Sequence, residues 1–208
     1  MSALRSGIGV AFAEIMSGYV AEGESDPVAG ARRGRTGGER FRFDLALRIE
    51  DLKAFLEAPL HEARIESGEV EWKGHLPATP VLPGGRVVLY RHDPSNPKRS
   101  FFDFVFSFED LASVPVEAEG RKVIFDDGRL DAASDLSTVF LTLRSRGAAR
   151  GAGITRVSFG ELLAQVQGLK VTGARTPKEK KDALHAFFGF MNAELCRVYR
   201  GFPRLFAA

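Results

Sequence analysis

The sequence has one cysteine, one tryptophan, three tyrosines and no long apolar run. The single thiol, Cys196, cannot form a disulfide within the chain, and four scattered histidines lack the spacing of a zinc site. No stretch of about 18 apolar residues is present to cross a bilayer. Lys and Arg total 29 against 27 Asp and Glu. The resulting formal charge of +2 argues against a protein whose main task is to coat nucleic acid.

The N-terminus does not have the pattern of an export signal. Glu14 interrupts the apolar stretch that begins at Ile8, and no small-residue cleavage site precedes the acidic positions Glu22 and Glu24. A lone cysteine also fits a reducing compartment. We therefore expect a cytoplasmic protein without a transmembrane segment.

Motifs for bound cofactors are missing as well. The glycine-rich segments 34–38 and 151–153 have neither the third glycine of a dinucleotide fingerprint nor the Lys-Ser/Thr of a phosphate-binding loop. The Gly-x-Ser-x-Gly pattern of the commonest serine hydrolases does not occur. The sequence therefore predicts no flavin, nicotinamide or metal cofactor.

Phenylalanine, by contrast, is abundant, with 17 residues. Large apolar residues alternate with polar ones over 41–49, which places one face of this strand in a core and the other in solvent. The same alternation recurs over 101–108. Phe suits an apolar guest because its rigid ring has no polar group to satisfy. Inside a barrel these faces either interlock as a plain packed core or leave room for a guest. We predict that a hydrophobic ligand contacts Phe41, Phe43, Leu45, Phe102, Phe104 and Phe106.

The remaining apolar segments are short and are separated by turn residues at hairpin spacing. Further strands are expected at 12–20, 61–74, 86–91, 114–118, 121–125, 136–143 and 154–157. The first of them fits a short helix equally well, Glu119-Gly120 is interpreted as a hairpin turn, and a β-bulge is expected near Gly68. These segments predict a mainly β fold, an antiparallel barrel or closed sandwich of about eight strands, in a single domain over residues 1–208.

Helices are expected at three places. Apolar residues at helical spacing over 52–56 predict a short helix across an open end of the sheet. Ser158 and Thr176 each begin a capping box, which predicts two C-terminal helices packed on the sheet. The second is the long amphipathic helix 177–200. Residues 21–38, rich in Gly, Ser, Pro and charge, are expected to form a mobile loop.

Two pairs of neighbouring ionisable residues could support catalysis, one of histidine with aspartate and one of two aspartates. His92 with Asp93 forms a base beside an orienting carboxylate, and Asp126 with Asp127 offers ligands for a divalent metal or a carboxyl with a raised pKa. Either pair would make the chain a small cofactor-independent enzyme, although both fit ordinary turns between strands. A purely structural partner protein is a further alternative. We favour a noncatalytic module that binds a hydrophobic ligand of sterol or fatty-acyl type.

A resemblance is carried by residues 12–19 (FAEIMSGY), 47–52 (LRIEDL), 101–109 and 122–127 (KVIFDD). These segments are similar to the accessory region beside flavin-dependent oxidoreductases of the glucose-methanol-choline class, the cholesterol-oxidase-like proteins. The resemblance implies an accessory or lipid-related role and an oxidoreductase as a protein partner. The noncatalytic module would then either bind a hydrophobic ligand or dock on an oxidoreductase. The flavin domain of that class, with its dinucleotide fingerprint and catalytic histidine, has no counterpart in this sequence. The resemblance therefore assigns no catalytic residue.

Overall fold

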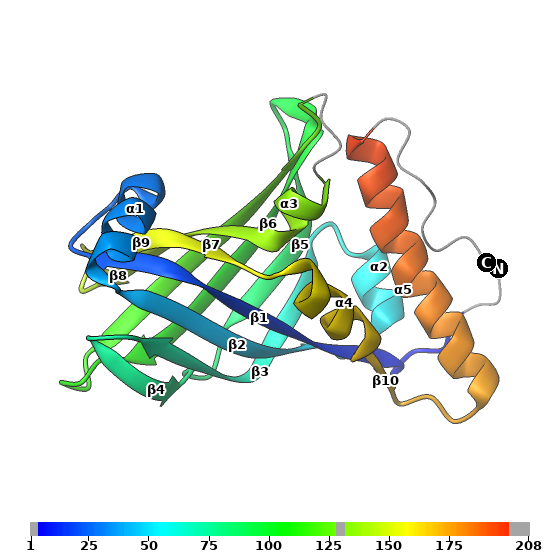
Figure 1. Cartoon of the computed structure of the whole chain (residues 1–208). Helices are drawn as coiled ribbons and strands as arrows, with labels where there is room; N and C mark the ends of the chain where they lie inside the picture. Colours follow the sequence, from blue (N-terminus) through cyan, green and yellow to red (C-terminus); the bar gives the residue numbers. More distant parts are fainter. Residues whose placement is uncertain (1–3, 128–131, 200–208) are drawn as a thin grey trace.

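The computed structural model describes residues 4–127 and 132–199, and within them ten strands form one antiparallel sheet. Eight of these strands close into a barrel (Figure 1). Closure occurs because β1 (Gly9–Glu22) pairs with β2 (Arg40–Ile49) on one side and with β9 (Ala148–Arg156) on the other. The predicted mainly β fold is confirmed, as a barrel rather than a sandwich. The other strands of the wall are β3 (His61–Trp72), β5 (Arg86–Asp93), β6 (Asn96–Glu109), β7 (Pro115–Phe125) and β8 (Thr138–Ser145).

Two short strands and five helices complete the described part of the chain. Their bounds are β4 (Leu76–Pro80), β10 (Lys170–Thr172), α1 (Pro27–Gly37), α2 (Leu52–Glu57), α3 (Ala132–Ser137), α4 (Phe159–Gln167) and α5 (Pro177–Val198). In Figure 1, α1 lies at one end of the barrel, and α2 and α5 lie at the opposite end. None of the helices in residues 4–127 and 132–199 has the length and apolarity needed to cross a membrane.

The two C-terminal helices begin where the sequence predicts. Ser158 and Thr176 each accept a hydrogen bond from the backbone N–H three residues later, and the glutamate at that position returns the bond. Helix α5 extends to Val198, with Tyr199 as its C-cap, so the prediction of a helix over 177–200 is confirmed within the described residues. Residue 200 lies outside them.

The prediction of a mobile loop over 21–38 is wrong, because residues 27–37 form α1. Asp26 caps this helix by accepting a hydrogen bond from Ala29 N at 2.7 Å. The helix buries glycines rather than large apolar residues, so it has no apolar periodicity to detect. A Cβ on Gly30 would lie 1.9 Å from the carbonyl oxygen of Ala152. Glycine, which usually disfavours helix, is here what lets the helix lie directly on β9.

The two glycines that were assigned to a turn and a bulge both lie in strands of the wall. Gly120 is inside the continuous strand β7, so the prediction of a hairpin at Glu119-Gly120 is wrong. A Cβ at Gly120 would come within 2.8 Å of Val139 Cγ1, and this crowding explains the glycine without a turn. The bulge expected near Gly68 is confirmed: the β2–β3 register shifts between Ala46 and Leu47, opposite residues 65–67.

Candidate functional site

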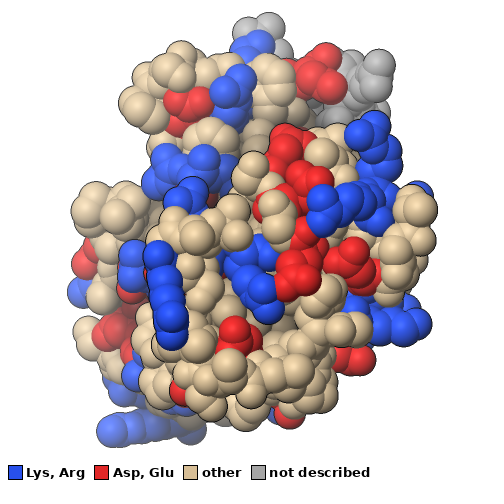
Figure 2. All heavy atoms as spheres, turned by 90° about the vertical axis from the view of Figure 1, so that its left-hand side faces the viewer, with Lys and Arg blue, Asp and Glu red and all other residues tan. Residues whose placement is uncertain are grey.

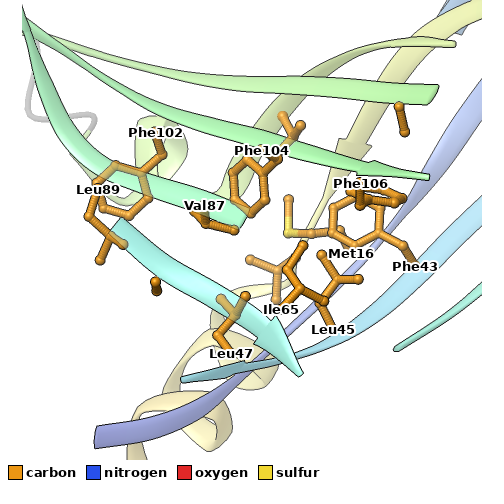
Figure 3. Packing of buried hydrophobic residues seen from close by; sticks show 14 of the residues in the cluster. Met16, Phe43, Leu45, Leu47, Ile65, Val87, Leu89, Phe102, Phe104 and Phe106 are labelled. Atoms are coloured by element: carbon orange, nitrogen blue, oxygen red, sulfur yellow. The ribbon is translucent and has the colours of Figure 1, made fainter. Parts of the chain in front are cut away.

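The six residues predicted to contact a ligand all face the barrel interior. Their exposed fractions are between 0% and 6%. Figure 3 shows Phe102, Phe104 and Phe106 in a row along β6, with Phe43 beside Phe106. The ring centroid of Phe43 lies 5.4 Å from that of Phe106 and 6.2 Å from that of Phe104. At this level of the barrel the protein's own side chains pack against one another.

The aromatic row continues from the barrel to α5 through Tyr90. The Tyr90 ring packs edge-on against Phe102 at 4.6 Å and against Phe190 of α5 at 5.8 Å. Sequence alternation does not predict this position, because a register shift in β5 turns both Leu89 and Tyr90 inward. Tyr90 has a φ of 51°, in the left-handed region. Burial raises the pKa of the Tyr90 hydroxyl.

A layer of rings, which we call the aromatic cover, lies where α2 and α5 meet the barrel. The ring of Phe187 lies 5.9 Å from that of Phe12, and the ring of Phe190 lies 5.4 Å from that of Phe55. The His61 ring packs edge-on against Phe190 at 4.5 Å, and its Nδ1 lies 2.8 Å from the Phe55 carbonyl oxygen. His61 is therefore part of the cover and has a structural hydrogen bond.

The His92-Asp93 pair does not form a base with its orienting carboxylate, because each side chain bonds elsewhere. Nε2 of His92 lies 2.9 Å from Glu194 on α5. Asp93 accepts hydrogen bonds from the backbone and hydroxyl of Ser95 and from Arg99. The Ser95 hydroxyl, the largest of these effects, lowers the pKa of Asp93. His92 thus helps to attach α5, and Asp93 holds a turn.

Of the acidic residues after β7, Asp135 has a local structural role. Asp126 is half-buried and Asp127 is exposed, next to residues that the structure does not describe. Asp135 accepts hydrogen bonds from Phe125 N, at 3.0 Å, and from the hydroxyl of Tyr199. Among the described residues, no group of three or more His, Cys, Asp and Glu side chains is placed to hold a metal ion.

A buried ion pair inside the barrel is the feature that sequence reasoning missed. Lys122 Nζ donates to Glu14 Oε1 at 2.6 Å, and the two side chains are 2% and 10% exposed. Lys122 is on β7 and Glu14 is on β1, and these strands are separated in the wall by β8 and β9. The pair therefore spans the interior. The ammonium also lies over the rings of Phe102 and Phe104, at 5.6 and 5.5 Å from their centroids.

A buried hydroxyl lies on the same wall of the barrel, two strands from Lys122. Thr155 on β9 pairs with Val139 on β8, and the β7–β8 register, which matches Arg121 with Phe140, brings Lys122 opposite Val139. Thr155 is fully buried, and its hydroxyl has no hydrogen-bond partner within the described part of the chain. The hydroxyl of Tyr90 is likewise buried without a hydrogen-bond partner among the described residues. A buried polar group without a partner is costly, which marks this region as one suited to an added ligand or water.

The α1 end has a surface hollow of about 480 Å³ that is open to solvent. It is lined by Glu22, Arg33, Gly37, Gly38, Glu39, Lys73, Gly74 and His75. His75 Nε2 lies 3.1 Å from Glu39 and Nδ1 lies 3.5 Å from Glu22, while the ring stacks on Trp72 at 4.3 Å. Both ring nitrogens thus face carboxylates of the protein. Figure 2 shows that Lys and Arg on this face are interspersed with Asp and Glu and do not form one continuous basic surface.

No protein-family model and no curated protein matches this sequence. Two solved structures are similar at 11% identity and a TM-score of 0.28. One is a protein with unknown function from Clostridium acetobutylicum ATCC 824, matched over 74% of this chain and 98% of that one. The other is a conserved protein of unknown function from Rhodopseudomonas palustris, matched over 76% and 100%. Similarity at this level carries no argument about function, and the relation to oxidoreductases stays a prediction.

Proposed function

We propose that this protein is a noncatalytic module that binds a hydrophobic small molecule, of sterol or fatty-acyl type, inside the α5 end of its barrel. The observation that carries the proposal is the row of rings from the interior to α5. Phe104 and Phe102 line the wall, and Tyr90 links Phe102 to Phe190 on the helix. Aromatic side chains in a concave interior, with a few polar groups among them, are typical of small-molecule sites.

The way this end is closed supports the same proposal. Helix α5 lies across the barrel mouth in Figure 1 and holds to the wall through side chains, those of the aromatic cover and of Glu194 and Arg197. The strands below it keep their own backbone hydrogen bonds. A guest can therefore enter by displacing α5 without opening the barrel wall.

The first experiment is native mass spectrometry and solvent extraction of protein purified from its own host. We expect one apolar molecule bound per chain. In delipidated protein, Phe104→Ala should weaken the binding of palmitic acid or cholesterol, whichever binds, and should cost less than the about 3–5 kcal/mol of unfolding free energy expected for a filled core. Phe101→Ala, three positions earlier on the half-buried outer side of the same strand, is the matched control and should leave affinity unchanged.

Two results together would overturn the proposal. One is that Phe104→Ala loses the full free energy expected for a packed core. The other is that neither palmitic acid nor cholesterol binds the delipidated protein. The six predicted side chains would then form a core and nothing more.

A further inference from the structure

Lys122 identifies a head group for the ligand. We propose that the bound molecule is a single-chain fatty acid whose carboxylate is held by Lys122 inside the barrel. This inference rests on the proposed function and narrows it from apolar molecules in general to anionic amphiphiles. It starts from the only buried cation among the described residues.

A buried ion pair is not needed to stabilise a barrel, since well-packed apolar residues of similar volume commonly serve as well. The other inward positions on β7 carry Val116, Ala118, Gly120 and Ile124. On this apolar strand face a lysine takes a place where an aliphatic side chain would pack without a desolvation cost. The exception points to a use for the charge beyond stability.

The surroundings of the ammonium leave it able to bind another anion. A lysine has three N–H donors, and within the described residues one acceptor is present, Glu14 Oε1. The rings of Phe102 and Phe104 lie beside the same nitrogen, so an acyl chain that starts at Lys122 would contact aromatic surface at once. The unpaired hydroxyl of Thr155, which lies two strands from Lys122 on the same wall, is a further donor that this part of the interior offers to a carboxylate.

The position of the pair also sets the direction of the ligand. Phe102, which pairs with Lys122 across β6 and β7, is the ring that contacts Tyr90 and thereby leads to Phe190 on α5. The level of Phe43 and Phe106 on the other side is filled by packed rings. A carboxylate at Lys122 would therefore place its acyl chain toward α5, along the aromatic row.

In this arrangement Glu14 competes with the ligand, because its carboxylate binds the same Lys122 ammonium that would bind the carboxylate of the fatty acid. Replacing Glu14 by Gln should free Lys122 and tighten fatty-acid binding. Replacing Lys122 by Met should weaken it. The double variant Glu14→Gln/Lys122→Met removes both charges, so it leaves no uncompensated buried ion and should fold even where Lys122→Met alone does not.

The experiment compares palmitic acid, hexadecan-1-ol and cholesterol as ligands of delipidated protein by calorimetry and native mass spectrometry. We expect the acid to bind more tightly than the alcohol by about tenfold to a hundredfold, the value of one charge-assisted hydrogen bond. The double variant should bind acid and alcohol equally. Lys73→Met, an exposed lysine at the α1 end, is the matched control and should keep the preference for acid.

The outcomes distinguish a failure of this inference from a failure of the proposed binding of a hydrophobic molecule. Equal binding of acid and alcohol by the wild type, or binding of cholesterol alone, would show that the barrel takes an apolar guest without using Lys122. An acid preference that survives in the double variant would do the same. Binding of none of the three molecules would remove the proposed function, and this inference with it.

Discussion

The two ends of the barrel are closed by different kinds of contact. At the α1 end, Gly30 and Gly34 bring a helix onto the backbone of β9 and β1, and a Cβ at either position would lie within 3.0 Å of backbone atoms. At the α5 end, a longer helix contacts the barrel through rings such as Phe187 and Phe190. Contact between backbones tolerates little displacement, whereas side chains can change rotamer. Of the two ends, the α5 end is therefore the one whose contacts can rearrange by side-chain rotation alone.

Removing a ring from the aromatic cover should have the largest effect. Phe187 is 4% exposed and packs against Phe12, so Phe187→Ala should lower the free energy of unfolding by about 3–5 kcal/mol. Chemical denaturation monitored by circular dichroism measures the change. Leu111→Ala, at a side chain that is 76% exposed, should change stability by no more than about 0.5 kcal/mol. Equal small losses for both variants would mean that α5 contributes little to the fold.

A methyl group at the other end tests the close approach of α1. Gly30→Ala forces the helix away from Ala152 and should lower the free energy of unfolding by about 1–3 kcal/mol, the usual cost of overpacking. Hydrogen exchange should locate the change in α1 and β9, with α5 protected as before. Faster exchange in α5 would contradict the independence of the two ends.

The same substitution in α5 should have the opposite sign. Gly189 lies inside this helix with nothing within 4 Å of its Cβ position, so Gly189→Ala removes backbone entropy from the unfolded chain without a clash. We expect a gain of about 0.5–1 kcal/mol in the free energy of unfolding. Thermal denaturation of the two glycine variants side by side makes the comparison. A loss of stability in Gly189→Ala would show that α5 packs closely around this position, against the open space at its Cβ.

The smallest effect concerns pH and the start of α5. The Arg5 guanidinium, which donates to Glu179 at 2.9 Å, and then the backbone N–H groups of Arg175 and Thr176 lower the pKa of Glu179 from its ordinary value of 4.5 to about 2. Because the carboxylate is favoured in the folded state, it adds stability above pH 4.5 that is lost as the pH falls toward 2. Glu179→Gln should therefore lower the Tm at neutral pH and approach the wild type near pH 2. The exposed variant Glu57→Gln is the control, and a Glu179→Gln difference that does not vary with pH would contradict the assignment.

Local patterns in the sequence predict the parts of the fold that depend on local chemistry. The alternation over 41–49 and 101–108 predicts β2 and β6, because period two follows directly from the pleat of a strand. The capping residues Ser158 and Thr176 predict the starts of α4 and α5, since a capping box spans only four positions. The inward orientation of Phe104 follows from the same alternation.

What could not be predicted depends on neighbours far away in the chain. Gly30 and Gly120 lie in segments whose sequence is typical of loops and turns. Glycine is required at these positions because Ala152 and Val139, which are distant in the sequence, leave no room for a Cβ. Glu14 and Lys122 are separated by 108 positions, and one sequence gives no sign that they meet. The alternation of a strand can indicate that a charged residue such as Lys122 points inward, but it does not indicate which residue lies opposite it.

The double pairing of β1 has a consequence for how the chain folds. Its partners lie far apart in sequence: β2 follows it after one short helix, whereas β9 and β10, which share its other edge, come near the end of the described chain. During synthesis β1 emerges before these partners and can pair with β2 early, yet its other edge stays open until β9 and β10 have left the ribosome. Contacts between such distant segments slow folding, and an unpaired edge invites association with other chains. The first strand to be made is thus the last to be fully paired.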